Sequence, residues 1–245
     1  MQSSHLGRRT LLHGAAIVPA AAWLAGPARY AAAQSSQPPP QQKEPEVSAT
    51  EDLMREHGVL RRVLIVYDHA ASVLRTDPAK LDVSALNAAT VLFRDFGEDY
   101  HERALEEAIV FPALRGAGEV AALVDILTAQ HERGREITAY VLATTGKGRV
   151  DAAALAPVLE NMSQMYQAHT AWEDTVVFPA WKKALPQDQL DEMADRFEEI
   201  ERQRFGQDGF DLGVRRIQEV QTALGIGDLA AFTAPAPPAT PSGSP

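Results

Sequence analysis

The hydrophobic spacing of this sequence is the feature that most restricts its fold. Between residues 48 and 230, apolar residues recur every three or four positions through most of the chain. This spacing places them on one face of an α-helix, whereas a half-buried strand would alternate apolar and polar residues. No Val-, Ile- and Thr-rich alternating run with hairpin turn residues is present. The sequence therefore predicts an all-α fold.

Breaks in the spacing divide this region into helices. We expect four long helices at about 48–75, 83–115, 119–144 and 151–185, a shorter one at about 187–204 and a weaker one at about 212–224. Asp77-Pro78 and two pairs of glycines separate the long helices. Such helices with short connections fold most simply as an up-down-up-down four-helix bundle, here with one or two extra C-terminal helices.

The two ends of the chain differ from this helical body. Residues 1–34 carry the pair Arg8-Arg9, an Ala-rich apolar run and small residues at 31–33, a pattern typical of a twin-arginine export signal. An uncleaved membrane anchor is the alternative, but the apolar run is short for a span and contains Pro19. We therefore expect a periplasmic or exported bacterial protein with no membrane attachment after cleavage.

The expected organisation then follows in chain order. After the signal at 1–34 come a Pro/Gln-rich linker at 35–47, the bundle at 48–205, a helical extension at 206–230 and a disordered Pro/Ala tail at 231–245.

Composition limits the chemistry that this chain can support. Its 245 residues include no cysteine, which excludes disulfides, thiolate metal sites, iron–sulfur clusters and a cysteine nucleophile. Any bound metal must have nitrogen and oxygen ligands. With 33 acidic and 23 basic residues the formal charge is −10, which argues against a nucleic-acid partner.

An internal repeat indicates where a site would form. The segments Glu106–Leu114 (EEAIVFPAL) and Glu173–Trp181 (EDTVVFPAW) match each other and lie on the second and fourth expected helices. Each of the four long helices also carries a histidine: His57, His101, His131 and His169. The body therefore contains two related helix pairs, each supplying two histidines and a carboxylate.

Helix geometry indicates that these side chains share an interior point. His169 and Glu173 are four residues apart, so at ~100° per residue they lie ~40° apart on one face. His101 and Glu106 are five residues apart, or ~140°, which needs a wide site or a local helix irregularity. Four imidazoles and two carboxylates suit iron, manganese or zinc. The candidate ligands are His57, His101, Glu106, His131, His169 and Glu173.

These motifs resemble the hemerythrin-like family, the HHE cation-binding domain, over about 48–205. The similarity lies in Glu56-His57, in Tyr100-His101 with the following Glu-Glu and Phe-Pro-Ala-Leu, and in His169-x-x-x-Glu173-Asp174 with Phe-Pro-Ala. It implies a carboxylate-bridged di-iron centre, with manganese or zinc less expected. By this resemblance His57 and His101 bind one iron, His131 and His169 bind the other, and Glu106 and Glu173 bridge them.

The sequence also departs from that family. Oxygen-carrying members have a second histidine on the third helix, four residues after the first, where this chain has Arg135. Glu132 or a water could fill the missing position, and Glu102 could compete with Glu106. The departures favour a more open and reactive site over stable oxygen transport.

Two functions follow from these expectations. The first is a non-haem di-iron protein that binds or senses dioxygen or another small diatomic ligand such as nitric oxide. The alternative is a redox enzyme, either a peroxidase or oxidase or one that handles nitric oxide, at the same site and with an unidentified electron donor. Iron storage is disfavoured because Glu-x-x-His, needed on two helices, fits only Glu98 to His101. A metal-free helical interaction module is the remaining possibility.

Overall fold

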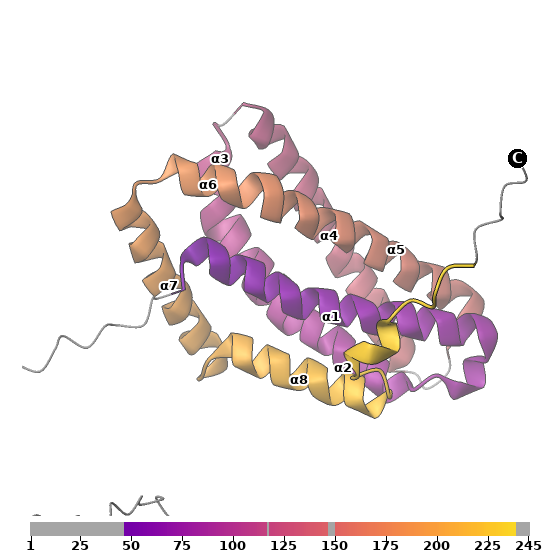
Figure 1. Ribbon diagram of the computed structural model, residues 1–245. Coiled ribbons are helices and arrows are strands. Elements are labelled where there is room, and N and C mark those ends of the chain that lie inside the picture. Colours follow the sequence, from indigo (N-terminus) through magenta and orange to yellow (C-terminus); the bar gives the residue numbers. More distant parts are fainter. Residues whose placement is uncertain (1–46, 117, 147–149, 239–245) are drawn as a thin grey trace, which may run out of the picture. The chain divides into compact units, whose positions relative to one another are not determined.

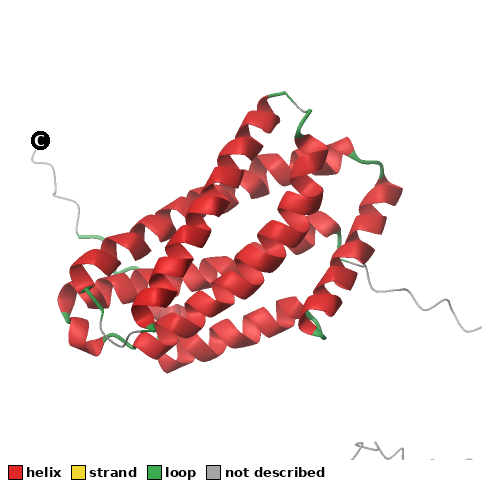
Figure 2. Cartoon of the chain, turned by 180° about the vertical axis from the view of Figure 1, so that it is seen from behind, coloured by secondary structure: helices red, strands yellow, loops and turns green. Residues whose placement is uncertain are grey.

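The structure, a computed structural model, describes residues 47–116, 118–146 and 150–238. The expected export signal, nearly all of the linker and the end of the Pro/Ala tail lie outside these residues. Within them every regular element is a helix and no strand occurs (Figure 2), so the predicted all-α fold class is confirmed. None of the described helices is both long and apolar enough to cross a bilayer.

Four long helical rods form the bundle. The first is α1 (Ala49–Thr76), followed by a short 3₁₀ turn at Pro78–Lys80. The second joins α2 (Val83–Leu92), a π-helical segment η2 (Phe93–Val110) and α3 (Phe111–Leu114). The third is α4 (Glu119–Thr145). The fourth joins α5 (Ala152–Trp172), a π-helical turn η3 (Glu173–Val177) and α6 (Phe178–Ala184).

Each of the four helical rods packs against its neighbours around a shared interior, and the fourth packs against the first. The most extensive contact is between α1 and α5, which run side by side in Figure 1. The second rod packs against α4, and α4 packs against α5. Asp82 and Asp151 cap the helix starts at α2 and α5 by accepting hydrogen bonds from backbone N–H groups that have no partner within the helix.

Two further helices cover one side of the bundle. Helix α7 (Gln187–Phe205) contacts α1 and η2, and α8 (Gly209–Ala223) packs along α1 and α2 (Figure 1). Their buried side chains Leu190, Phe197 and Ile217 extend the apolar core. Helix α8 begins at Gly209, ahead of the expected start near 212, and Asp208 caps it. A 3₁₀ turn at Leu229–Phe232 runs into the segment expected to begin the tail.

The π-helical segments lie where the repeat is located. Phe111 donates its N–H to the carbonyl of Glu106, and Phe178 donates to that of Glu173, each five residues back. Each phenylalanine precedes a proline, Pro112 or Pro179, that lacks an N–H. Because residues five apart lie one turn apart in a π-helix, the spacing from His101 to Glu106 becomes one turn. A local helix irregularity is thus what accommodates that spacing.

Candidate metal centre

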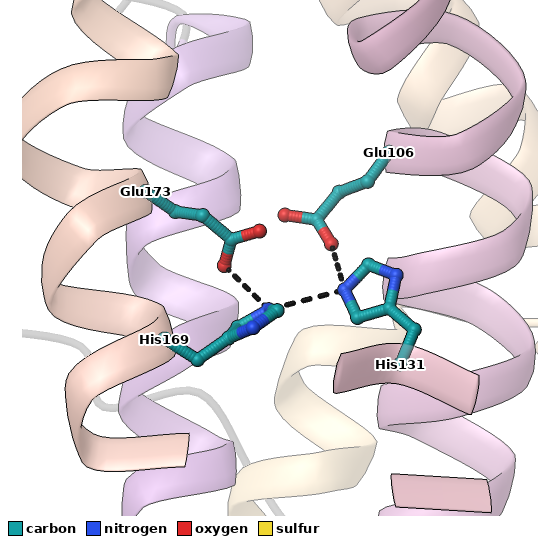
Figure 3. Close-up of side chains that lie close together, drawn as sticks. All are labelled: Glu106, His131, His169 and Glu173. Carbon is teal, nitrogen blue, oxygen red and sulfur yellow. Dashed lines mark hydrogen bonds and ion pairs between the residues drawn. The ribbon is translucent and has the colours of Figure 1, made fainter. Parts of the chain in front are cut away.

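The structure brings all six candidate ligands to one place inside the bundle. His57 comes from α1, His131 from α4 and His169 from the end of α5, while Glu173 is the first residue of η3. His101 and Glu106 both lie in η2. Every one of these side chains is buried. Figure 3 shows four of them, with His169 and Glu173 on one helical rod pointing toward Glu106 and His131 on two others.

The histidines form two pairs whose Nε2 atoms face each other. The Nε2 atoms of His57 and His101 are 3.0 Å apart, and those of His131 and His169 are also 3.0 Å apart. The two ring centroids in each pair are 4.7 Å and 4.8 Å apart. Each half of the centre therefore offers two imidazole nitrogens to one point.

The two glutamates connect these pairs. Glu106 places Oε1 3.2 Å from Nε2 of His101 and Oε2 3.3 Å from Nε2 of His131. Glu173 places Oε2 3.0 Å from Nε2 of His169 and 3.3 Å from Nε2 of His57. Of three groups of closely spaced ligand atoms, Glu102, Glu107 and His131 form one, and Glu106 belongs to the other two. One contains His57, His101 and Glu106, and the other contains Glu106, His131, His169 and Glu173.

The outward nitrogen of each imidazole has an acceptor of its own. Nδ1 of His57 donates to Asp174 at 2.7 Å, and Nδ1 of His101 to Glu56 at 2.5 Å. His131 donates in the same way to Glu107, and His169 to the side-chain oxygen of Gln130, both at 2.9 Å. Carboxylate and amide oxygens only accept, so these bonds place the hydrogen on Nδ1 and leave the Nε2 lone pair facing inward.

The resulting interior consists of acceptors. All four carboxylate oxygens of Glu106 and Glu173 are buried and have no hydrogen-bond partner among the described residues. Buried acceptors without donors are costly, and a cation at their centre satisfies them all at once. Imidazole nitrogen with carboxylate oxygen is a donor set for iron, manganese or zinc. The residues therefore fit two bound metal ions.

Without a bound metal, protons on the histidines partly offset the negative charge of the buried glutamates. Burial by itself lowers the pKa of His101, but the Glu106 and Glu56 carboxylates outweigh it and hold that pKa well above its usual range. Burial opposes the change in Glu106 as well, yet His101 and His131 hold the pKa of this carboxyl well below its usual range. A metal ion entering the centre competes with these protons.

Arg135 lies beside the centre and supports an outer acceptor. Its Nη2 donates to Oε1 of Glu107 at 2.5 Å, the oxygen that also accepts from His131. In the other half Arg61 donates to Oδ2 of Asp174, while His57 donates to Oδ1 of the same carboxylate. The arginine four residues after each of these histidines thus orients the carboxylate that orients the imidazole.

The two glutamates considered as replacement ligands lie in different places. Glu132 is exposed on α4 and does not face the centre. Glu102 is buried, and its Oε1 accepts a hydrogen bond of 2.7 Å from the hydroxyl of Tyr166, whose ring packs on His169. Its Oε2 faces Arg135 at 3.5 Å. Glu102 is therefore near the His131 half but already engaged by Tyr166.

Two phenylalanines of the repeat cover the imidazoles. The ring of Phe111 stacks on His131 with centroids 5.5 Å apart, and that of Phe178 stacks on His57 at 5.3 Å. Both side chains are almost fully buried. They shield the two halves of the centre from water in equivalent ways.

Sequence reasoning did not assign the four outer acceptors. A signal for them was present, because each is the direct chain neighbour of a candidate ligand: Glu56 of His57, Gln130 of His131, Glu107 of Glu106 and Asp174 of Glu173. Which imidazole each one reaches depends on the register between helices, which the sequence pattern does not contain.

Comparison with known proteins agrees with this centre. The model of the hemerythrin HHE cation-binding domain matches residues 48–181, more than half of the chain. The chain belongs to this family. Two similar proteins are the uncharacterised protein Rv1995 of Mycobacterium tuberculosis and the uncharacterised protein Mb2018 of Mycobacterium bovis. Each is 41% identical over 198 residues, which cover 79% of this chain and 76% of the relative. No solved structure matches this chain.

The matched region of the HHE domain contains all six candidate ligands and all four outer acceptors. It ends at residue 181, within α6, so α7 and α8 are additions outside it. The expected membership of the hemerythrin-like family is thus confirmed for the bundle.

Proposed function

We propose that this chain is a non-haem di-iron protein that binds or senses dioxygen or another small diatomic ligand in the periplasm. The observation that carries the proposal is the convergence of four inward Nε2 atoms on the unpartnered carboxylates of Glu106 and Glu173. His57 and His101 would hold one ion, and His131 and His169 the other. Both carboxylates would contact both ions and offset their mutual repulsion.

The donor set leaves room for a further ligand. The inner side chains would give one ion three closely spaced ligands and the other four, fewer than the six of an octahedral site. Iron bound there supplies electrons and open coordination positions for dioxygen or nitric oxide. The chain's own contribution is to fix each imidazole through its Nδ1 acceptor and to keep water out with Phe111 and Phe178.

The periplasmic location rests on the Arg8-Arg9 signal pattern. A twin-arginine route carries folded proteins, which suits a centre filled in the cytoplasm. Fractionation of cells that express the full chain tests the location. The wild type is expected in the periplasm, and replacement of both arginines by lysine is expected to retain the protein in the cytoplasm.

A redox enzyme is the second candidate, and a specific arrangement favours it. The buried Tyr166 hydroxyl, Glu102 and Arg135 form a polar group beside the His131 half of the centre. These three side chains would place a hydroxyl proton, a carboxylate and a positive charge close to an open coordination position of the metal. Turnover of peroxide or nitric oxide that is lost in H169A would favour the enzyme over a carrier or sensor.

Metal analysis and optical spectroscopy test the main proposal. Protein loaded anaerobically with ferrous iron is expected to retain about two ions per chain, the number of histidine pairs. Exposure to oxygen is then expected to produce a charge-transfer absorption that E106Q and E173Q lose. E132Q serves as the matched control, because Glu132 is exposed and lies outside the centre. A wild-type protein that stays free of metal would refute the proposal.

A further inference from the structure

A surface hollow lies directly outside the half of the centre that contains His57. It has a volume of about 360 Å³. The start of α1 forms one of its walls, and Phe178, Pro179 and Lys182 of α6 form the other. Met54, in the α1 wall, is three residues before His57 and therefore lies near the same face of that helix.

Phe178 belongs to both the hollow and the centre. It lines the hollow, and its ring stacks on the imidazole of His57 with centroids 5.3 Å apart. Its backbone N–H is bonded to the carbonyl of Glu173, where the helix changes from π to α. The residue is almost fully buried, so its ring lies beneath the hollow and not free within it. Phe178 therefore separates the hollow from the imidazole of His57.

The lining of the hollow favours small uncharged molecules. Met54, Phe178 and Pro179 are apolar, and the formal charges of Glu51 and Lys182 cancel. An anion entering past these apolar side chains would lose its hydration without gaining a net opposite charge, whereas a neutral molecule has little hydration to lose.

The repeat supplies an internal comparison. Phe111 stacks on His131 much as Phe178 stacks on His57. Phe111 is not part of the lining of this hollow. A substitution of either ring removes the same buried group, but only Phe178 lies between this hollow and the centre.

We propose that Phe178 controls entry of small uncharged molecules from this hollow to the His57 half of the centre, selecting them by charge. The identity of these molecules as metal ligands rests on the proposed function. The access route itself is a property of the chain with or without metal.

Chemical modification of the metal-free protein tests the route. Diethyl pyrocarbonate is a small neutral reagent that acylates unprotonated imidazole nitrogen, and peptide mass spectrometry reports its rate at each histidine. F178A is expected to raise the rate at His57 by about tenfold, equivalent to lowering the opening barrier by about 1.4 kcal/mol. F111A is expected to leave the rate at His57 unchanged.

A second variant covers the case in which F178A loosens the bundle. M54W fills the hollow without removing a buried ring, and it is expected to slow acylation of His57 below the wild-type rate. The proposal is overturned if F178A accelerates all the buried histidines equally, if F111A has the same effect at His57, or if M54W has no effect there.

Ligand binding to iron-loaded protein provides a separate readout. F178A is expected to speed the association of nitric oxide more than that of the azide anion. If the protein binds no metal, the proposed function fails while the acylation pattern still decides the access route. The two failures are therefore distinguishable.

Discussion

Nδ1 of His57 lies 2.7 Å from Oδ1 of Asp174, although the two residues are 117 positions apart in the chain. Glu173, the residue before Asp174, reaches the opposite nitrogen of the same imidazole at 3.3 Å. Glu106 and Glu107 enclose His131 in the same manner. Consecutive residues on one helix thus fix both edges of an imidazole on another, which sets its orientation before any metal arrives.

Loss of an outer acceptor should weaken metal binding without removing a ligand. D174N replaces a charged acceptor of the His57 Nδ1–H with an amide, so the imidazole becomes less basic and less well oriented. Affinity for ferrous iron is expected to fall by about 10- to 100-fold. Titration against a competing chelator measures it. E132Q, the same type of change on the exposed face of α4, should bind as the wild type does.

Substitution of the shared carboxylate should separate folding from metal binding. Metal that binds only the folded state at 100 times its dissociation constant stabilises the wild type by about 2.7 kcal/mol. E106Q is expected to lose most of that gain, because Glu106 contributes to both halves of the centre. Denaturant unfolding with and without metal measures the difference. An E106Q protein stabilised by metal as much as the wild type would contradict a metal role for this residue.

Arg135 should be needed for stability because Glu102 is buried next to it. R135M leaves that carboxylate with the Tyr166 hydroxyl as its remaining partner, at an expected cost of about 2 kcal/mol in the free energy of unfolding. The double variant R135M/E102Q is expected to recover part of this loss. Unfolding of the two single variants and the double variant gives the coupling energy directly. Purely additive effects would show that the two side chains do not interact.

Gly134 should resist substitution although it lies inside a helix. A Cβ there would lie 2.1 Å from the hydroxyl oxygen of Tyr166, so G134A must displace the phenol that donates to Glu102. Overpacking of this kind costs about 1–3 kcal/mol, which exceeds the gain of about 1 kcal/mol in helix propensity. In Y166F/G134A the hydroxyl that the new Cβ would meet is absent. G134A should therefore lower the free energy of unfolding less in the Y166F background than in the wild type. Thermal unfolding of the four proteins measures both effects.

Stability should decrease as the pH rises toward neutrality. Burial and the neighbouring Glu56 raise the pKa of Asp52 to about 7. Burial likewise raises the pKa of Glu201 to about 7, with the nearby Asp208 adding to the effect. The folded state then holds more protons than the unfolded chain between about pH 4 and pH 7, so unfolding becomes easier as the pH rises through this range.

D52N and E201Q should remove part of this pH dependence. Each variant replaces a buried acid by a group that stays neutral, so its stability should be flatter between pH 4 and 7 and higher than that of the wild type at pH 8. Denaturant midpoints across this range measure the slopes. D188N, on the exposed start of α7, is the control and should retain the wild-type slope.

Much of the fold could be predicted from the sequence because helix periodicity and helix breaks are local signals. Three-and-four spacing, together with glycine and Asp77-Pro78, gave the long helices nearly at their observed bounds. The start of α8 was less predictable, because Asp208 and Gly209 precede a weak apolar pattern. The long π-helical segment was not predictable from apolar spacing. The main sequence signal for it was the five-residue separation of His101 and Glu106.

The candidate site was predictable only in its inner part. The six candidate ligands stand out because the repeat places them alike, and the structure brings their side chains together. That they hold iron stays a prediction. The outer acceptors depend on how one helix is registered against another, as in the contact of Gln130 with His169, and no pattern within a single helix encodes that register.

Each half of the repeat is incomplete without the other. Glu106 comes from the first helix pair yet reaches His131 of the second, and Glu173 comes from the second yet reaches His57 of the first. The first pair supplies His57, His101 and Glu106 by itself, but the group around His131 and His169 includes Glu106 from the first pair. Separation of the two hairpins would therefore remove Glu106 from His131 and Glu173 from His57, so the inner cluster depends on the whole bundle.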